Sequence, residues 1–147
     1  METDSQKYYS DKKVAENYDI ERFLTPGGIM FDEFEKSVVI SNLPMNNTNA
    51  KILDAGAGSG RFTIEIAKRG FHVIACDYSP AMLDVIRSKI ENFGLTDNVE
   101  LSRQDITQMT FKSNEFDYVY SLRVLVNLDT KDNERKALNE IIRVCKP

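Results

Sequence analysis

The hydrophobic positions of the chain follow two spacings, which predict strands alternating with amphipathic helices. Short apolar runs have the length of buried strands, and they occupy residues 51–54, 71–76, 99–102 and 116–121. Apolar residues that recur every three or four positions predict helices over 28–42, 61–69, 80–93 and 131–145. Strands that alternate with helices indicate βαβ units. We therefore expect a doubly wound α/β fold on a parallel sheet, with right-handed crossovers.

The first part of the chain has a different pattern and predicts a helical arm. Residues 1–25 are polar with scattered aromatic residues, and only Val14 and Tyr18 share a helical spacing there. Gly27 and Gly28 then interrupt the chain before the first amphipathic helix. We expect residues 1–49 to form an N-terminal helical arm or cap, and residues 50–147 to form the core that carries the sheet.

Composition and charge narrow the possible functions. The 147 residues fit one domain, and a net charge of −4 argues against a general nucleic-acid binder, which needs surplus basic residues. No apolar run reaches the roughly 18 residues of a membrane span, and the polar N-terminus predicts no secretory signal. Cys76 and Cys145 have no metal-ligand spacing, so we expect two reduced core cysteines, a cytoplasmic protein and no metal.

Polar features stand directly after each of the four predicted strands. They are the glycine turn 55–60, Asp77, Asp105, and the segment Ser121–Arg123. In a doubly wound sheet, ligands bind outside the carboxyl ends of the strands, where the strand order reverses. The sequence therefore predicts one ligand site at this edge of the sheet.

The spacing of the glycine turn indicates which ligand the site takes. Three alternating glycines, at 56, 58 and 60, can adopt backbone angles closed to other residues and let a ligand approach the main chain. A dinucleotide fingerprint needs another glycine where Arg61 stands. Asp54 leads the turn and would repel a pyrophosphate, whereas it suits a cationic or amino-bearing ligand. Asp77 can accept hydrogen bonds from ribose hydroxyls.

The run Ile52–Arg61, ILDAGAGSGR, resembles the glycine motif of class I S-adenosylmethionine-dependent methyltransferases. The resemblance extends over residues 14–147 and is strongest to the small-molecule branch that contains the ubiquinone/menaquinone biosynthesis methyltransferases. It implies a Rossmann-like fold and S-adenosylmethionine as cofactor. It also implies a cofactor-binding role for a set of residues near the predicted edge: Tyr18, Asp54, Gly56, Ala57, Gly58, Gly60, Asp77, Tyr78, Met82, Asp105, Ile106 and Ser121.

The first of these implied roles belong to the two leading strands. In the family, the glycine turn lies beside the methionine part of the cofactor, and the residue matching Asp54 is oriented toward it. Asp77 matches the acidic residue that holds the ribose hydroxyls. Tyr78 and Met82 match positions that flank the adenine.

The remaining implied roles come from later in the sheet and from the arm. Asp105 and Ile106 match a segment whose aspartate accepts from the adenine amino group. Ser121 lies in the segment that matches the end of the fourth strand, close to the methionine amino group. Residues 14–19, with Tyr18, resemble the arm that often covers the cofactor.

The implied chemistry is in-line transfer of a methyl group from a sulfonium to a small-molecule acceptor, which depends chiefly on positioning. No residue stands out as a general base, and the only histidine, His72, lies inside a strand and away from its carboxyl end. Aromatic and basic residues of the arm and of the segment after the fourth strand could line an acceptor pocket: Tyr8, Tyr9, Tyr18, Arg22 and Arg123.

The chain departs from the family in its number of strands. The family's domain usually has seven, and residues 143–147 resemble the segment that leads into its fifth strand. We therefore expect a fold without the last strands, an open edge on the fourth strand, and self-association or a partner chain at that edge. Two other functions stay open: a catalytically silent S-adenosylmethionine-binding regulatory module or partner subunit, and a nicotinamide-dependent dehydrogenase with a variant turn.

Overall fold

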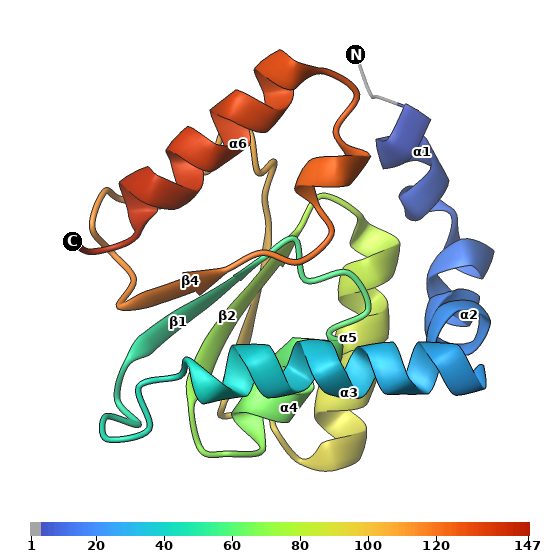
Figure 1. Cartoon of the computed structure of the whole chain (residues 1–147), viewed down its shortest axis with the longest axis horizontal. Helices are drawn as coiled ribbons and strands as arrows, with labels where there is room; N and C mark the ends of the chain where they lie inside the picture. The colour runs from blue at the N-terminus through green and yellow to red at the C-terminus, as the bar shows by residue number, and fades with distance from the viewer. Residues whose placement is uncertain (1–3) are drawn as a thin grey trace.

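The computed structural model, which describes residues 4–147, has a four-stranded parallel sheet between two layers of helices (Figure 1). Its strands are β1 (Lys51–Ala55), β2 (His72–Asp77), β3 (Val99–Arg103) and β4 (Tyr118–Tyr120). They lie in the order β3-β2-β1-β4, and every pair is parallel. The strand order reverses between β1 and β4, which is the topological switch point of a doubly wound fold. The predicted fold class is confirmed.

The helices follow the predicted pattern with small changes in their ends. In chain order they are α1 (Asp4–Ser10), α2 (Lys12–Phe23), α3 (Pro26–Ser41), α4 (Arg61–Ala67), α5 (Pro80–Phe93) and α6 (Lys131–Val144), with a 3₁₀ turn, η1 (Leu125–Asn127), between β4 and α6. Ser79 caps α5 by accepting from the backbone N–H of Met82 at 3.1 Å, and Gly94 ends that helix with φ of 64°. Local capping chemistry therefore sets these boundaries.

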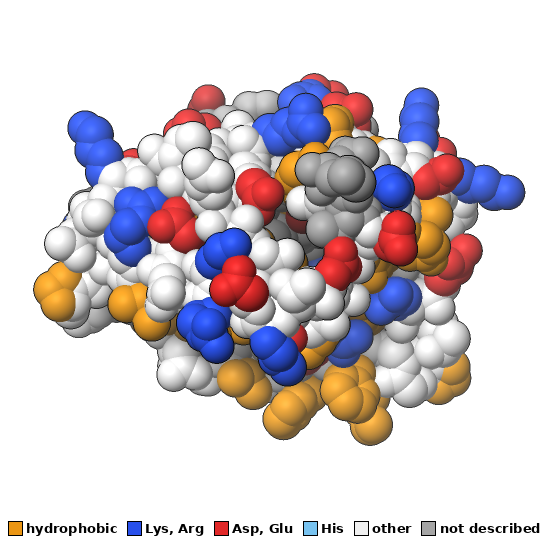
Figure 2. Space-filling model, turned by 90° about the horizontal axis from the view of Figure 1, so that it is seen from above, with side chains coloured by type: hydrophobic (Ala, Val, Ile, Leu, Met, Phe, Trp, Pro, Cys, Tyr) orange, Lys and Arg blue, Asp and Glu red, His pale blue; other side chains and the backbone are white. Residues whose placement is uncertain are grey.

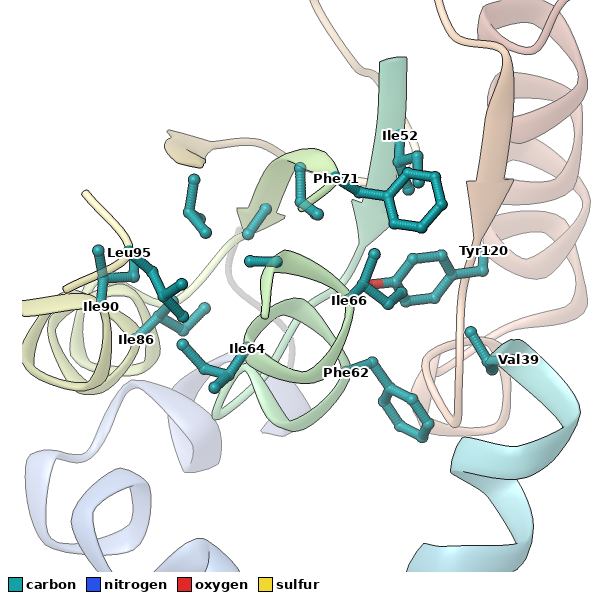
Figure 3. Close-up of a cluster of buried hydrophobic side chains, with 14 of the residues drawn as sticks. Val39, Ile52, Phe62, Ile64, Ile66, Phe71, Ile86, Ile90, Leu95 and Tyr120 are labelled. Atoms are coloured by element: carbon teal, nitrogen blue, oxygen red, sulfur yellow. The ribbon is translucent and has the colours of Figure 1, made fainter. Parts of the chain in front are cut away.

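Neighbouring residues of each strand point into different halves of the core. Ile52 belongs to the cluster under α3, α4 and α5, whereas Leu53 belongs to the cluster under α6. In the larger cluster, apolar side chains of α4 pack against side chains of the sheet, α3 and α5 (Figure 3). Phe62 of α4 packs against Tyr120 of β4 with 6.2 Å between ring centroids. Burial on both faces explains why the strands read as nearly continuous apolar runs.

The fourth strand is shorter than the sequence predicts. Phe116 lies ahead of β4 and forms an isolated parallel bridge with Cys145 instead. The backbone N–H of Phe116 donates to the carbonyl of Val144 at 3.0 Å, and that of Lys146 donates to the carbonyl of Phe116 at 2.8 Å. The apolar pattern that predicted a strand from residue 116 therefore reflects a buried Phe116 paired outside the main sheet.

Helix α3 presents an apolar face to the surface. Its exposed side chains include Met30 and Phe34, which are 67% and 65% exposed, together with Ile29, Phe31 and Val38. Figure 2 shows hydrophobic side chains gathered along the lower edge of the view, on the side where α3 lies in Figure 1. Among the described residues, no helix is long and apolar enough to span a membrane.

Candidate functional site

A cavity opens at the carboxyl ends of the strands, where the switch point predicts a ligand site. Residues from the loops after β1, β2, β3 and β4 line it, and α1 and α2 add to its wall. Most of the predicted cofactor residues face this cavity: Tyr18, Asp54, Gly56, Ala57, Gly58, Asp77, Tyr78, Met82, Asp105 and Ile106. Gly60 and Ser121 do not line it. The hydroxyl of Ser121 is buried without a hydrogen-bond partner among residues 4–147.

The three glycines of the turn have different reasons to be glycine. All have positive φ, at 82° for Gly56, 55° for Gly58 and 76° for Gly60. A Cβ at Gly56 would lie 2.2 Å from Cγ2 of Val124, and one at Gly60 would lie 2.8 Å from Cγ1 of Ile86. A Cβ at Gly58 would meet nothing within 4 Å. The protein's own packing therefore accounts for two of the glycines, and only Gly58 leaves open space in the cavity wall.

Four backbone N–H groups of the turn are already engaged in hydrogen bonds within the protein. The N–H groups of Gly56 and Ala57 both donate to the carbonyl of Cys76 at 2.9 Å, and that of Gly60 donates to the carbonyl of Ala57 at 2.9 Å. The N–H of Gly58 donates to Oδ2 of Asp77 at 2.8 Å. A pyrophosphate needs such donors, and these four N–H groups are not available to it.

Asp77 ends β2 with its carboxylate held in place. Oδ2 accepts from Gly58, and Oδ1 accepts from the backbone N–H of Ser79 at 2.9 Å. Burial raises the pKa of Asp77, and the backbone donors partly oppose that change. Each carboxylate oxygen can accept more than one hydrogen bond. Asp77 is therefore fixed in orientation and still able to accept from ligand hydroxyls.

Asp54 is a second carboxylate in the cavity wall, and it is more deeply buried than Asp77. It is 3% exposed, and its Oδ2 accepts from the hydroxyl of Thr63 at 2.6 Å. Burial raises the pKa of Asp54 to about 6, which leaves it largely ionised at neutral pH. Among the described residues, no ion pair joins Asp54 or Asp77 to a basic side chain. Unpaired buried anions favour a positively charged ligand, and S-adenosylmethionine, with its sulfonium and ammonium groups, fits this requirement.

The far end of the cavity combines apolar surface with an oriented carboxylate. Met82 and Ile106 are 2% and 8% exposed. Oδ1 of Asp105 accepts from the backbone N–H of Thr107 at 2.9 Å and from its hydroxyl at 2.7 Å. Arg103 donates to the carbonyl of Tyr78 at 3.1 Å and fixes that segment. An apolar slot with a carboxylate at one side suits a flat heterocycle that carries an amino group.

The arm is fastened to the rim of the cavity by polar contacts. Asp19 of α2 accepts from the hydroxyl of Ser59 and from Nζ of Lys89, both at 2.5 Å. The hydroxyl of Ser79 donates to the carbonyl of Tyr9 at 2.7 Å. Tyr18 lines the cavity, and burial raises the pKa of its phenol. The arm therefore lies at the rim of the cavity.

Several residues of the site were not among the predicted cofactor residues. Arg61 forms ion pairs with Asp32 and Glu35 of α3, and Nε of Arg123 donates to Oε1 of Glu35 at 2.8 Å. The sequence gives no periodic signal for such pairs, because their members lie far apart in the chain. Tyr9, which was predicted for an acceptor pocket, also lines the cavity. The other lining residues outside the predicted cofactor set come from the arm, from the ends of the strands and from the segments that follow them: Ser5, Gln6, Ser59, Phe62, Cys76, Ser79, Gln104, Leu122, Val124, Asn127 and Leu128.

The two cysteines and the histidine named in the sequence analysis do not form a reactive centre in the cavity. Cys145 is half-buried, so only Cys76 is a fully buried core cysteine as predicted. Cys76 is buried, and burial raises the pKa of its thiol to about 12, so it is not a thiolate at neutral pH. His72 is the first residue of β2 and therefore lies at the end of the sheet opposite the cavity. Among the described residues, no group of three or more His, Cys, Asp or Glu could hold a metal ion.

The fold and the cavity define a Rossmann-like protein whose site suits a cationic nucleoside. Over residues 52–147 the chain matches the family described as "Methyltransferase domain", and it belongs to that family. It is 37% identical over 100 residues to demethylmenaquinone methyltransferase of Clavibacter sepedonicus, covering 66% of this chain and 37% of that protein. It is 33% identical over 138 residues to the ubiquinone/menaquinone biosynthesis C-methyltransferase UbiE of Vibrio cholerae. This match covers 91% of the present chain and 50% of the relative.

Solved structures agree with this assignment. A protein of Methanococcus maripaludis described as an S-adenosylmethionine-dependent methyltransferase superposes with a TM-score of 0.76 and 25% identity, covering 93% of this chain and 60% of that one. A methyltransferase from Aquifex aeolicus superposes with a TM-score of 0.66 and 22% identity, covering 99% and 69%, which shows a shared fold. The predicted family, fold and cofactor are confirmed. The chain spans about half the length of the curated relatives it matches.

Proposed function

We propose that this chain binds S-adenosylmethionine in the cavity at the switch point and takes part in transfer of its methyl group to a small-molecule acceptor. The observation that carries the proposal is a pair of carboxylates, the buried Asp54 and the half-buried Asp77, that line the cavity without an ion pair to a basic side chain of the described residues. Such a pair favours a cationic ligand and disfavours a nucleotide phosphate. We also propose that residues 1–49 act as the cap and 50–147 as the cofactor-binding core.

We assign the binding residues by their chemistry. Asp77 accepts from the ribose hydroxyls, and Asp54 faces the positive end of the cofactor beside the open wall at Gly58. Asp105 accepts from the adenine amino group, while Met82 and Ile106 supply apolar contact with the ring. The support for these roles is that these side chains line one cavity and that hydrogen bonds to protein groups fix Asp54, Asp77 and Asp105 in orientation.

The catalytic contribution of the chain is positioning and exclusion of water. When bound, S-adenosylmethionine supplies a methyl group on a sulfonium. Tyr18 and the other arm residues close one side of the cavity, and a closed site favours a reaction in which positive charge disperses. Alignment of donor and acceptor can contribute several kcal/mol without any covalent intermediate.

We propose that the acceptor is a small molecule and that the chain acts in the cytoplasm. The net charge of −4 argues against a nucleic-acid substrate, and both relatives with quinone-biosynthesis names act on small molecules by those names. The alternative is a catalytically silent module that binds the cofactor as a sensor or as the partner of an active subunit. Binding alone does not separate these two functions, so a transfer assay is needed.

Calorimetric titration tests the cofactor. S-adenosylhomocysteine should bind with one site per chain, and NAD in a parallel titration should not. Binding of NAD without binding of S-adenosylhomocysteine would refute the proposal. A radiolabelled methyl-transfer screen with S-adenosylmethionine and a panel of phenols, quinols and carboxylic acids then separates an enzyme from a silent module.

A further inference from the structure

A second, shallower groove adjoins the cavity on the side of the arm. It is formed by the end of α2, the start of α3 and the loop after β4, and its lining residues are Arg22, Phe23, Gly27, Gly28, Phe31 and Arg123. Arg123 also lines the cofactor cavity, so the two hollows share a wall. The two hollows therefore adjoin at Arg123.

Arg123 is held in an uncommon conformation at this shared wall. Its φ is 60°, in the left-handed region that few residues other than glycine adopt, and its carbonyl accepts from Nδ2 of Asn127 at 2.5 Å. Its Nε donates to Glu35, and its guanidinium lies 5.7 Å from the ring centroid of Phe31. Among the described residues, no hydrogen bond engages its Nη1 or Nη2. These two donors are available to a ligand.

Arg22 supplies a second guanidinium to the same groove. It lies 5.0 Å from the ring centroid of Tyr18, and no carboxylate of the described residues pairs with it. Glu35 is the acidic group that meets Arg123, and it is shared with Arg61. Because Arg61 is also paired with Asp32, Glu35 remains to balance Arg123, and Arg22 is the cation of the groove that no described carboxylate pairs with.

The other residues that line the groove are two phenylalanines and two glycines. Phe31 is 56% exposed, and Gly27 has open space where a side chain would stand. A Cβ at Gly28 would lie 2.4 Å from the carbonyl oxygen of Arg22, so glycine there lets the start of α3 pack directly on the end of α2. The groove thus offers an exposed aromatic side chain, Phe31, beside two arginines.

We propose that the groove binds the methyl acceptor and that this acceptor is an aromatic molecule carrying an anionic group, a carboxylate or a phosphate. The anionic group accepts hydrogen bonds from Arg22 and Arg123, a recognition for which the planar guanidinium is well suited. The aromatic ring lies against Phe31, and the reacting atom faces the cofactor cavity past Arg123. This inference rests on the proposed function for its description of the ligand as a methyl acceptor.

Binding of simple aromatic anions to the full chain tests the groove. Benzoate and phenyl phosphate, with neutral benzamide as the matched control, are titrated into ¹⁵N-labelled protein, alone and saturated with S-adenosylhomocysteine. The side-chain Nε–Hε signals of Arg22 and Arg123 should shift with the anions and not with benzamide. Comparison of the two anions shows whether a carboxylate or a phosphate is preferred.

Three variants make the result specific. Arg22→Gln and Arg123→Gln should each weaken benzoate binding about tenfold, which corresponds to the loss of one charge-assisted hydrogen bond. Arg135→Gln, at an exposed position of α6, should leave it unchanged.

The outcomes separate the two proposals. Equal binding of benzoate and benzamide, or full benzoate binding by both groove variants, would overturn the inference while leaving the cofactor proposal intact. If S-adenosylhomocysteine does not bind, the proposed function fails, and the titration of benzoate into the protein alone still decides whether the groove is an anion site.

Discussion

The carboxylate of Asp77 and the backbone N–H of Gly58, 19 positions apart in the chain, are joined by a hydrogen bond of 2.8 Å. This bond ties the turn after β1 to the end of β2. The same carboxylate faces the cavity in which we propose that the ribose binds. One side chain therefore shapes the site and contributes to its proposed contacts.

Replacing Asp77 should remove both contributions. We expect Asp77→Ala to weaken S-adenosylhomocysteine binding by about ten- to a hundredfold, because hydrogen bonds to a charged acceptor contribute about 1.5–3 kcal/mol. Calorimetry measures the change. The control is Asp84→Ala on the exposed face of α5, where the carboxylate pairs with Arg87. Equal affinities for the two variants would contradict the role of Asp77.

Substitution by alanine should lower the free energy of unfolding by different amounts at two glycines of the turn. Gly56→Ala drives a Cβ into Val124, and we expect it to destabilise the protein by about 2–4 kcal/mol through overpacking and backbone strain. Gly58→Ala meets open space and should cost only about 1 kcal/mol of backbone strain. Urea unfolding of the ligand-free protein measures both.

A second substitution tests the reason for the larger effect. Val124→Ala removes the methyl groups that the new side chain would meet, so the Gly56→Ala/Val124→Ala double variant should recover part of the loss. Adding Val124→Ala to Gly58→Ala should give no such recovery. Gly58→Val should fold and should lose S-adenosylhomocysteine binding, since its side chain extends from the cavity wall.

The buried carboxylate of Asp54 should make stability depend on pH. Its pKa is about 6 in the folded protein against an ordinary value of 3.8, so the folded state binds a proton more tightly than the unfolded state. Stability conferred by the protonated form is present below about pH 4 and is lost as the pH rises through 6. At pH 7 the ionised group costs about 3 kcal/mol.

The variant Asp54→Asn checks this expectation. It should raise the free energy of unfolding at pH 7 and reduce the fall in stability between pH 4 and 6, because the amide carries no charge and still accepts from Thr63. Part of the fall in stability with rising pH should remain in this variant, because burial also raises the pKa of Asp77. The same variant should weaken cofactor binding. An unchanged pH profile in chemical denaturation would refute the assigned cause.

The arm should loosen when its attachment to α5 is removed. Lys89 donates to Asp19 at 2.5 Å and to the carbonyl of Ser59 at 2.6 Å. Because these partly exposed contacts contribute at most about 1 kcal/mol, Lys89→Met should speed amide hydrogen exchange in α2 by about fivefold and leave β1 and β2 unaffected. Lys131→Met, which removes an exposed pair with Glu134, is the control. Equal exchange rates in α2 for the Lys89→Met and Lys131→Met variants would contradict the role of Lys89 in attaching the arm.

The edge of β4 should support association of the chain. Within the described residues, β4 pairs with β1 on one side only, and such an edge presents unpaired backbone groups. We predict that the weight-average mass in sedimentation rises with protein concentration from the micromolar to the millimolar range. A monodisperse monomer at high concentration would contradict this prediction.

Much of the fold was predictable because its information is local. Apolar spacing predicted each strand and helix of the core, and Ser79 and Gly94 ended α5 as capping chemistry requires. The edge that holds the site followed from the parallel order of the strands. The two helices of the arm before α3 were less clear, because their few apolar residues give a weak periodic signal.

The parts that escaped prediction depend on contacts between distant residues. Packing against Val124 and Ile86 explains Gly56 and Gly60, which the spacing alone attributed to a ligand. The ion pairs of Arg61 and Arg123 with α3 join residues that lie far apart in the chain, so no regular spacing in the sequence predicts them. Pairing of Phe116 with Cys145 shortened the fourth strand for the same reason.

The unpaired carboxylates of the cavity have a practical consequence for assays. Small organic cations such as Tris and imidazolium should compete with the cofactor, because Asp54 and Asp77 attract any cation that fits beside Gly58. Affinities measured in amine buffers would then be too weak, and fragment screens would be biased toward amines. Phosphate or carboxylate buffers avoid this bias at Asp54 but would occupy the groove between Arg22 and Arg123, so a zwitterionic buffer is the neutral choice.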